Sequence, residues 1–87
     1  MAQRRYTSPG FRDERYRLVI DLLKRRRLEL GLSQQALAER IGVHKQFVSR
    51  VELGERRLDV VEFVDVARAL GLEPGTLVSS ISSLENP

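Results

Sequence analysis

The fold is decided by one stretch of the chain, LSQQALAERIGVHKQFVSRVELG, residues 32–54. Apolar residues recur in it at spacings of three and four, which predicts short amphipathic helices over about 34–40 and 45–53. Ser33 is a good N-cap for the first helix, because its hydroxyl can accept a hydrogen bond from a free backbone N–H. Gly42 permits the positive φ that a tight turn requires. The stretch therefore predicts two short helices joined by a tight turn.

The two faces of this helix pair differ in chemistry. Ala38 is small enough to let the helices approach closely, and Val43 and Val48 are expected to lock them together. The opposite face of the second helix is polar and carries His44, Lys45, Gln46, Ser49 and Arg50. A short helix with a polar N-terminal face is the kind of element that enters the major groove of DNA.

Three further helices are predicted outside that stretch. The first begins near Asp13 and ends before Gly31, Asp59 caps another over about 60–70, and Pro74 begins a short last helix ending near Ser80. The expected inward stripes are Tyr16, Val19, Ile20, Leu23 and Arg27 in the first helix, and Val60, Phe63, Val64 and Ala67 in the fourth. Because no strand-like alternation occurs, the predicted fold class is all-α with five helices.

The 87 residues suffice for a single domain, which we expect to span 13–82. Residues 1–12 contain the breaker Ser8-Pro9-Gly10 and are expected to form a flexible N-terminal arm, and residues 83–87 a C-terminal tail.

Composition excludes several classes of site. The chain has no cysteine and a single histidine, His44, so disulfides and cysteine zinc sites are excluded and no metal or other cofactor is expected. There is no P-loop or glycine-rich dinucleotide motif, and we expect no enzyme. No apolar run approaches the roughly 20 residues of a membrane helix, and nothing resembles a signal peptide. A soluble cytoplasmic protein is expected.

Basic residues are concentrated in the first part of the chain. The net charge is +3, but residues 1–30 hold nine basic and four acidic residues, against six and eight in residues 31–87. Such a surface can attract phosphates. A solvated basic helix explains it equally well, and charge alone does not separate the two interpretations.

Residues 23–77 resemble the Cro and lambda-repressor-like helix-turn-helix family, also called the XRE family. The matching residues are Arg27, Gly31-Leu32-Ser33-Gln34, Leu37-Ala38, Ile41-Gly42-Val43, Val48-Ser49, Glu52, Gly54 and Ala67 to Gly71. The run GERRLDVVEF, residues 54–63, further resembles small stand-alone bacterial members. The resemblance implies a lambda-repressor-like domain that binds double-stranded DNA and regulates transcription.

The resemblance also implies roles for individual residues. The expected base contacts are Lys45, Gln46, Ser49 and Arg50, and the expected DNA backbone contacts are Gln34, His44, Phe47, Arg26, Arg56 and Arg57. Base chemistry fits independently, since Arg or Lys pairs with guanine and Gln with adenine. His44 could instead cap its helix, and Phe47 could serve packing. Arg27 and Glu52 are expected to form a structural ion pair between the first and third helices.

A late apolar stripe suggests self-association. It comprises Leu77, Val78, Ile81 and Leu84, and it could cap the core or form the homodimer interface that the last helix often builds in this family. A two-fold dimer would place two recognition helices about 34 Å apart and would read a near-palindromic operator. Repression by occlusion is the simplest mode of regulation. The alternative is an antitoxin-type or other protein-interaction module that also binds its own operator.

Overall fold

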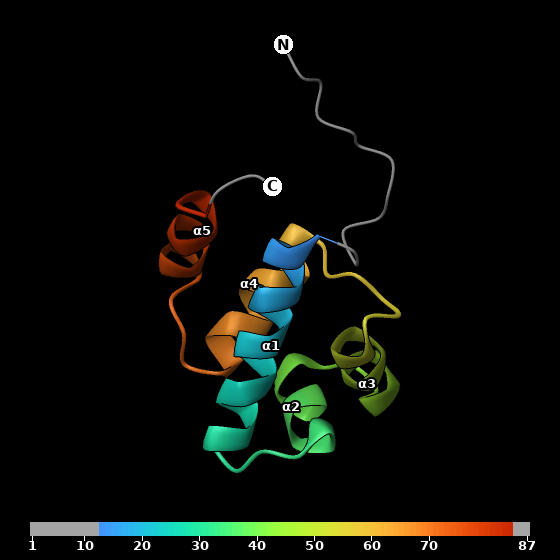
Figure 1. Ribbon diagram of the computed structural model, residues 1–87. Helices are drawn as coiled ribbons and strands as arrows, with labels where there is room; N and C mark the ends of the chain where they lie inside the picture. The colour runs from blue at the N-terminus through green and yellow to red at the C-terminus, as the bar shows by residue number, and fades with distance from the viewer. Residues whose placement is uncertain (1–12, 85–87) are drawn as a thin grey trace.

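The computed structural model describes residues 13–84, and five helices follow one another along that part of the chain (Figure 1). They are α1 (Glu14–Glu29), α2 (Gln34–Ile41), α3 (Lys45–Leu53), α4 (Val60–Ala69) and α5 (Pro74–Ser82). The predicted all-α fold with five helices is confirmed, and each helix begins and ends within two residues of its predicted bounds. None of these helices is long and apolar enough to cross a membrane. The predicted arm and the end of the predicted tail lie outside the described residues.

The helix starts follow from local capping chemistry. The side chains of Asp13 and Ser33 each accept a hydrogen bond from a backbone N–H in the first turn of α1 and α2. At α4 the cap is reciprocal, because Asp59 accepts from the N–H of Glu62 while the Glu62 side chain accepts from the N–H of Asp59. Gly42 ends α2 with φ of +73°, the left-handed conformation that a residue with a Cβ avoids.

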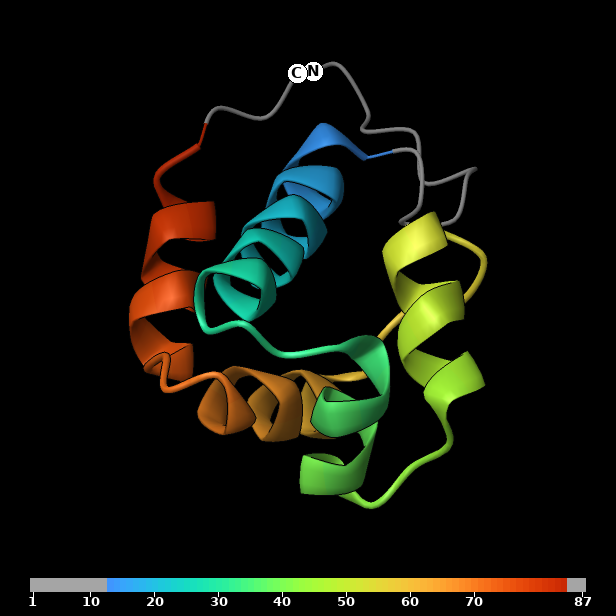
Figure 2. The same ribbon diagram turned by 90° about the horizontal axis from the view of Figure 1, so that it is seen from below.

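The core lies between α1 and the four shorter helices. Figures 1 and 2 both place α5 and α3 on opposite sides of α1. The second helix packs on α3 and α4, which fixes the pair α2–α3 against the rest of the fold. The buried apolar residues are Ile20, Leu23, Leu37, Ala38, Val48, Val51, Val66, Ala67, Leu70 and Leu77. The core therefore takes residues from all five helices.

The predicted inward stripe of α4 was wrong at one end. Val60 is 73% exposed, because it is the first residue of the helix and its side chain borders an open groove. Val66 is buried instead, beside the predicted Ala67, and Phe63 and Val64 are half-buried.

Candidate nucleic-acid interface

The turn between α2 and α3 is closed by backbone hydrogen bonds. The N–H of Gly42 donates to the carbonyl of Glu39 at 3.3 Å, and the N–H of Val43 donates to the carbonyl of Ala38 at 3.0 Å. Ala38 has no exposed surface, so the two helices meet closely at this residue. His44 occupies the N-cap position of α3, but its side chain forms no cap hydrogen bond. The expected capping role of the imidazole is therefore absent.

The inner and outer faces of α3 separate cleanly. Val48 and Val51 are buried in the core. On the outer face Lys45, Gln46 and Arg50 are exposed, and Ser49 is half-buried. None of these four polar side chains forms a hydrogen bond or ion pair with another residue between 13 and 84. Their donors and acceptors are therefore available to an external partner with hydrogen-bonding edges.

Gln46 and Arg50 line an open surface hollow that continues past α3 to the start of α4. Phe47, Arg56 and Glu62 also border it. The hollow thus combines Gln46 and Arg50 of α3 with a cation and a carboxylate from elsewhere in the chain.

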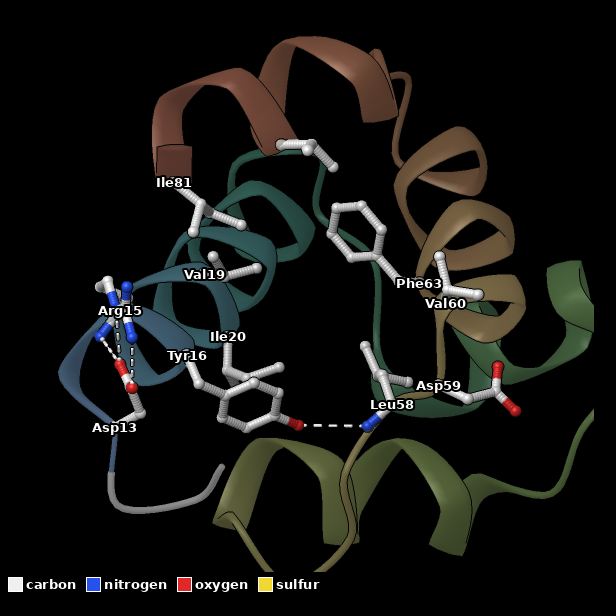
Figure 3. Close-up of a pocket in the computed structure, with 11 residues that line it drawn as sticks. Asp13, Arg15, Tyr16, Val19, Ile20, Leu58, Asp59, Val60, Phe63 and Ile81 are labelled. Carbon is white, nitrogen blue, oxygen red and sulfur yellow. Dashed lines mark hydrogen bonds and ion pairs between the residues drawn. The ribbon is translucent and has the colours of Figure 1, made fainter. Parts of the chain in front are cut away.

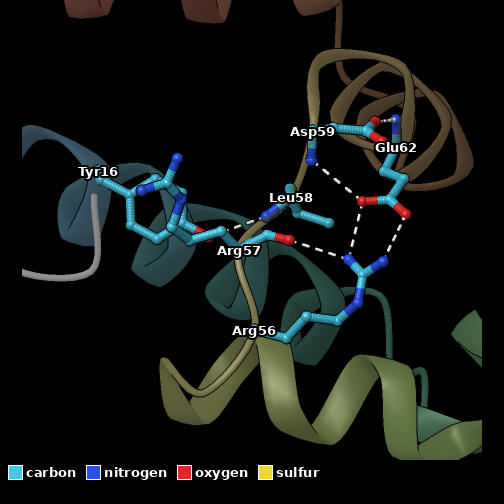
Figure 4. Close-up of polar contacts among 6 residues, drawn as sticks. All are labelled: Tyr16, Arg56, Arg57, Leu58, Asp59 and Glu62. Atoms are coloured by element: carbon cyan, nitrogen blue, oxygen red, sulfur yellow. Dashed lines mark hydrogen bonds and ion pairs between the residues drawn. The ribbon is translucent and has the colours of Figure 1, made fainter. Parts of the chain in front are cut away.

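Arg56 is held by several contacts beside α3 (Figure 4). Its Nη1 and Nη2 donate to the two carboxylate oxygens of Glu62, each at 2.8 Å, and Nη1 also donates to the carbonyl of Arg57 at 2.9 Å. Its Cζ lies 4.4 Å from the ring centroid of Phe47, which is a cation–π distance. The hydrogen bonds from Arg56, aided by the Asp59 N–H, hold the pKa of Glu62 below its usual value. Arg57, by contrast, is exposed.

Glu62 was not among the site residues predicted from the sequence. The spacing of Asp59 and Glu62 is that of a capping box, so their role in capping α4 could have been predicted from the sequence. The ion pair of Glu62 with Arg56 could not have been predicted, because it depends on how the loop after α3 turns back towards α4.

Arg27 and Glu52 form a buried ion pair between α1 and α3. Their side chains are 7% and 9% exposed, and Arg27 Nε lies 2.7 Å from Glu52 Oε2. Arg27 Nη2 donates to Glu52 Oε1 at 2.9 Å, and its Nη1 donates to the carbonyl of Leu32 at 2.7 Å. Gln34 Nε2 donates to Glu52 Oε1 at 2.9 Å. Gln34 thus belongs to this structural network at the start of α2.

Arg26 does not join the hollow beside α3. Its Nε donates to the carbonyl of Leu70 at 3.1 Å, and Arg40 Nη1 donates to the carbonyl of Ala69 at 3.0 Å. Both guanidinium groups therefore satisfy free carbonyls at the C-terminus of α4, where the helix dipole favours positive charge. The structure gives Arg26 an architectural contact that its predicted role did not include.

An apolar groove of about 540 Å³ opens between α1, the start of α4 and α5 (Figure 3). Tyr16 lines the groove, and the Tyr16 hydroxyl accepts a hydrogen bond from the N–H of Leu58 at 3.2 Å. Val78 and Ile81, from the predicted dimer stripe, line the groove. Leu77 is only 9% exposed and belongs to the core, so its predicted place in a subunit interface does not fit this structure.

Comparison with known proteins gives consistent matches. A family model described as helix-turn-helix matches residues 23–77. Over 52 residues the chain is 42% identical to an uncharacterized HTH-type transcriptional regulator of Methanothermobacter thermautotrophicus, covering 60% of this chain and 75% of that protein. Over 63 residues it is 35% identical to an uncharacterized HTH-type transcriptional regulator of Sinorhizobium fredii, covering 72% and 82%.

Two solved structures are similar over most of their length. An XRE-family like protein from Pseudomonas syringae pv. tomato superimposes with a TM-score of 0.78 at 40% identity, covering 85% of this chain and 90% of that one. The restriction-modification controller protein C.AhdI from Aeromonas hydrophila gives a TM-score of 0.68 at 31% identity, with coverage of 80% and 99%.

Proposed function

Since the chain belongs to the XRE-type helix-turn-helix family of DNA-binding transcription regulators, we propose that it is a repressor that reads a specific DNA sequence in the major groove with α3. The observation that carries this proposal is the outer face of α3. Lys45, Gln46 and Arg50 are exposed there and have no partner among residues 13–84, in a structure where five arginines are matched to internal acceptors.

Each outer side chain of α3 has a chemically defined partner on a base edge. Lys45 and Arg50 would donate to guanine O6 and N7, and Gln46 would pair with adenine N6 and N7. Ser49 can donate or accept at either base. Each well-formed bidentate pair discriminates against a wrong base by about 1–3 kcal/mol. This mechanism is binding without chemistry, so no catalytic role is proposed.

Backbone contacts would fix the position of α3 on the duplex. Phosphate contacts carry no sequence information themselves, but they set register and orientation. The residues proposed for them are Gln34, His44, Phe47, Arg56 and Arg57, which lie at the starts of α2 and α3, on α3, and in the loop that follows it. Arg26 is left out of this set, because its Nε already donates to the carbonyl of Leu70 at the end of α4.

The apolar groove supports a homodimer. Val78, which is 52% exposed, and Ile81 line the groove from α5, and Leu84, just beyond the end of α5, is 40% exposed. A second copy packed there about a two-fold axis would present two α3 helices to a near-palindromic operator, and occlusion of a promoter would repress it. A cytoplasmic location is part of this proposal, because the protein must share a compartment with its DNA.

A substitution in the groove tests the dimer. Val78→Asp places a charge at an exposed site without disturbing the core, and light scattering should then report a monomer. If Val78→Asp stays dimeric, the interface lies elsewhere. The groove would then favour the second candidate function, a protein-interaction module such as an antitoxin whose apolar groove receives another protein.

The main test is a comparison of two double variants in DNA binding. Lys45→Ala/Arg50→Ala removes two cations from α3, and Lys24→Ala/Arg25→Ala removes two exposed cations from α1. The probes are a duplex selected by the wild-type protein from a randomised pool and an unrelated duplex of equal length. We expect the α3 variant to lose discrimination between the duplexes, while the α1 variant keeps it. Equal discrimination by both variants would refute reading by α3.

A further inference from the structure

The hydrogen bonds of Arg56 leave one specific edge of its guanidinium unused. An arginine has five N–H donors in a planar fork. Both hydrogens of Nη1 are committed, to Glu62 and to the carbonyl of Arg57, and one hydrogen of Nη2 is committed to Glu62. The remaining donors are Nε–H and the second hydrogen of Nη2, and no residue between 13 and 84 accepts from them. These two donors lie parallel along one side of the guanidinium plane.

That free edge has the geometry of a phosphate-binding fork. Two parallel N–H donors on one side of a guanidinium bind two phosphate oxygens in a bidentate manner. In Figure 4 the edge that carries Nε points away from the loop formed by Arg57 and Leu58. Arg56 also lines the hollow that contains Gln46 and Arg50 of α3. The residue that carries the free edge therefore borders the surface proposed to face the duplex.

The other sides of the guanidinium are fixed. Glu62 holds its end, and the ring of Phe47 covers one face at 4.4 Å. Glu62 is fixed in turn, because its Oε1 also accepts from the N–H of Asp59 in the α4 cap. Phe47 is a residue of α3 itself. The orientation of Arg56 is thus tied both to the recognition helix and to the start of α4.

We infer that Glu62 is a positioning residue for DNA binding, which holds Arg56 so that its Nε–Nη2 edge binds a phosphate of the duplex read by α3. This inference rests on the proposed function and extends it to a carboxylate, a group that DNA ordinarily repels. A side chain ordered in advance loses less rotamer entropy on binding. On this reasoning Glu62 favours binding despite its charge.

The test compares two substitutions that remove the same charge. Glu62→Gln breaks the bidentate carboxylate pairing, yet its amide oxygen can still accept from the Asp59 N–H and keep the α4 cap. Glu55→Gln removes an exposed carboxylate one residue before Arg56 that has no partner within 13–84. We expect Glu62→Gln to bind the selected duplex roughly three- to tenfold more weakly than wild type, from the cost of ordering one long side chain. Glu55→Gln should bind equally well or more tightly.

A double-mutant cycle separates positioning from a general structural effect. Arg56→Gln should weaken binding and reduce the slope of log affinity against log salt by about 0.9, as expected for one lost phosphate contact. Glu62→Gln should leave the slope unchanged and should have no further effect in the Arg56→Gln background.

Three results would overturn the inference. Binding by Glu62→Gln as tight as wild type would show that Glu62 does not assist Arg56. A loss that persists in the Arg56→Gln background would show that Glu62 acts through the fold. Failure of the wild-type protein to select any duplex would overturn the proposed function together with this inference, whereas the first two results would leave the proposed function standing.

Discussion

Replacing Arg27 by methionine removes one partner of the buried ion pair between α1 and α3. Methionine fills much of the apolar volume of the arginine side chain but cannot donate a hydrogen bond. Among residues 13–84, the Glu52 carboxylate, 9% exposed, then keeps only the hydrogen bond from Gln34. The carbonyl of Leu32 also loses the donor that lies 2.7 Å away. The variant thus strands a buried charge and a backbone acceptor together.

The expected loss of stability is large for a domain of this size. Removing one partner of a buried ion pair costs about 3–5 kcal/mol, because the remaining charge is left without compensation. Small domains are stable by about 5–15 kcal/mol in total. One kcal/mol corresponds to about 4–8 °C in the melting temperature of a domain of 60–100 residues, so Arg27→Met should lower Tm by roughly 12–40 °C.

Thermal unfolding followed by circular dichroism measures this effect, and the choice of control matters. Arg25→Met removes an exposed arginine of the same helix, whereas Arg26→Met would also break the bond to the Leu70 carbonyl. The double variant Arg27→Met/Glu52→Leu should recover most of the lost stability, since an apolar pair replaces the buried charges. If Arg27→Met melts within about 3 °C of Arg25→Met, less than 1 kcal/mol depends on the pair and the reasoning is wrong.

Three further variants test local features of the fold. In urea unfolding at neutral pH, Glu62→Gln should be less stable than wild type. Because the pKa of Glu62 is lowered in the folded state, this difference in stability should be present above about pH 4.3, the ordinary pKa of a glutamate, and should disappear as the pH falls through the lowered pKa. Gly42→Ala should cost roughly 1–2 kcal/mol through backbone conformation alone, since an added Cβ would meet no atom within 4 Å; an unchanged urea midpoint would contradict this. Tyr16→Phe should cost about 1 kcal/mol by removing the acceptor for the Leu58 N–H, and amide exchange at Leu58 should accelerate.

The sequence predicted the helices well because their ends are encoded locally. Ser33, Asp59 and Gly42 act within their own turns, through a side-chain cap or a left-handed φ, so no distant contact is needed to place them. The failure at Val60 has the opposite origin. Periodicity assigned it to the inner face of α4, but burial at the first residue of a helix depends on whether another element covers that end.

The polar site was only partly predictable for the same reason. The outer face of α3 follows from the buried positions of Val48 and Val51, which periodicity identifies. The ion pair of Arg56 with Glu62 joins a loop residue to a residue of α4 six positions later. The hydrogen bond from Arg26 to the carbonyl of Leu70 spans 44 positions. Neither contact leaves a periodic signal in the sequence, because each depends on how the helices pack.

The basic stretch at the end of α1 shows why a charge count cannot assign roles to single residues. Charge alone left Lys24, Arg25 and Arg26 as either a phosphate-binding surface or a solvated face, whereas the family resemblance implied a structural ion pair with Glu52 for Arg27. The structure pairs Arg27 with Glu52 and adds an unpredicted contact for Arg26, whose Nε donates to the carbonyl of Leu70 at the end of α4, while Lys24 and Arg25 are exposed. The positive charge of α1 therefore comes partly from arginines that make contacts within the fold and partly from exposed residues that could attract phosphates.

The cations that stabilise the fold and those proposed to read DNA are consequently separate sets. The structural arginines each donate to a carboxylate or carbonyl within the fold, so their loss is felt in the free protein. Lys45 and Arg50 have no internal acceptor within residues 13–84, and exposed side chains of this kind change stability by at most about 0.5 kcal/mol. Arg56 is the exception, because its carboxylate-bound end contributes to the fold while its free edge stays available for a ligand. It is the residue at which a change in the packing of α4 would be transmitted to the surface that α3 is proposed to present to DNA.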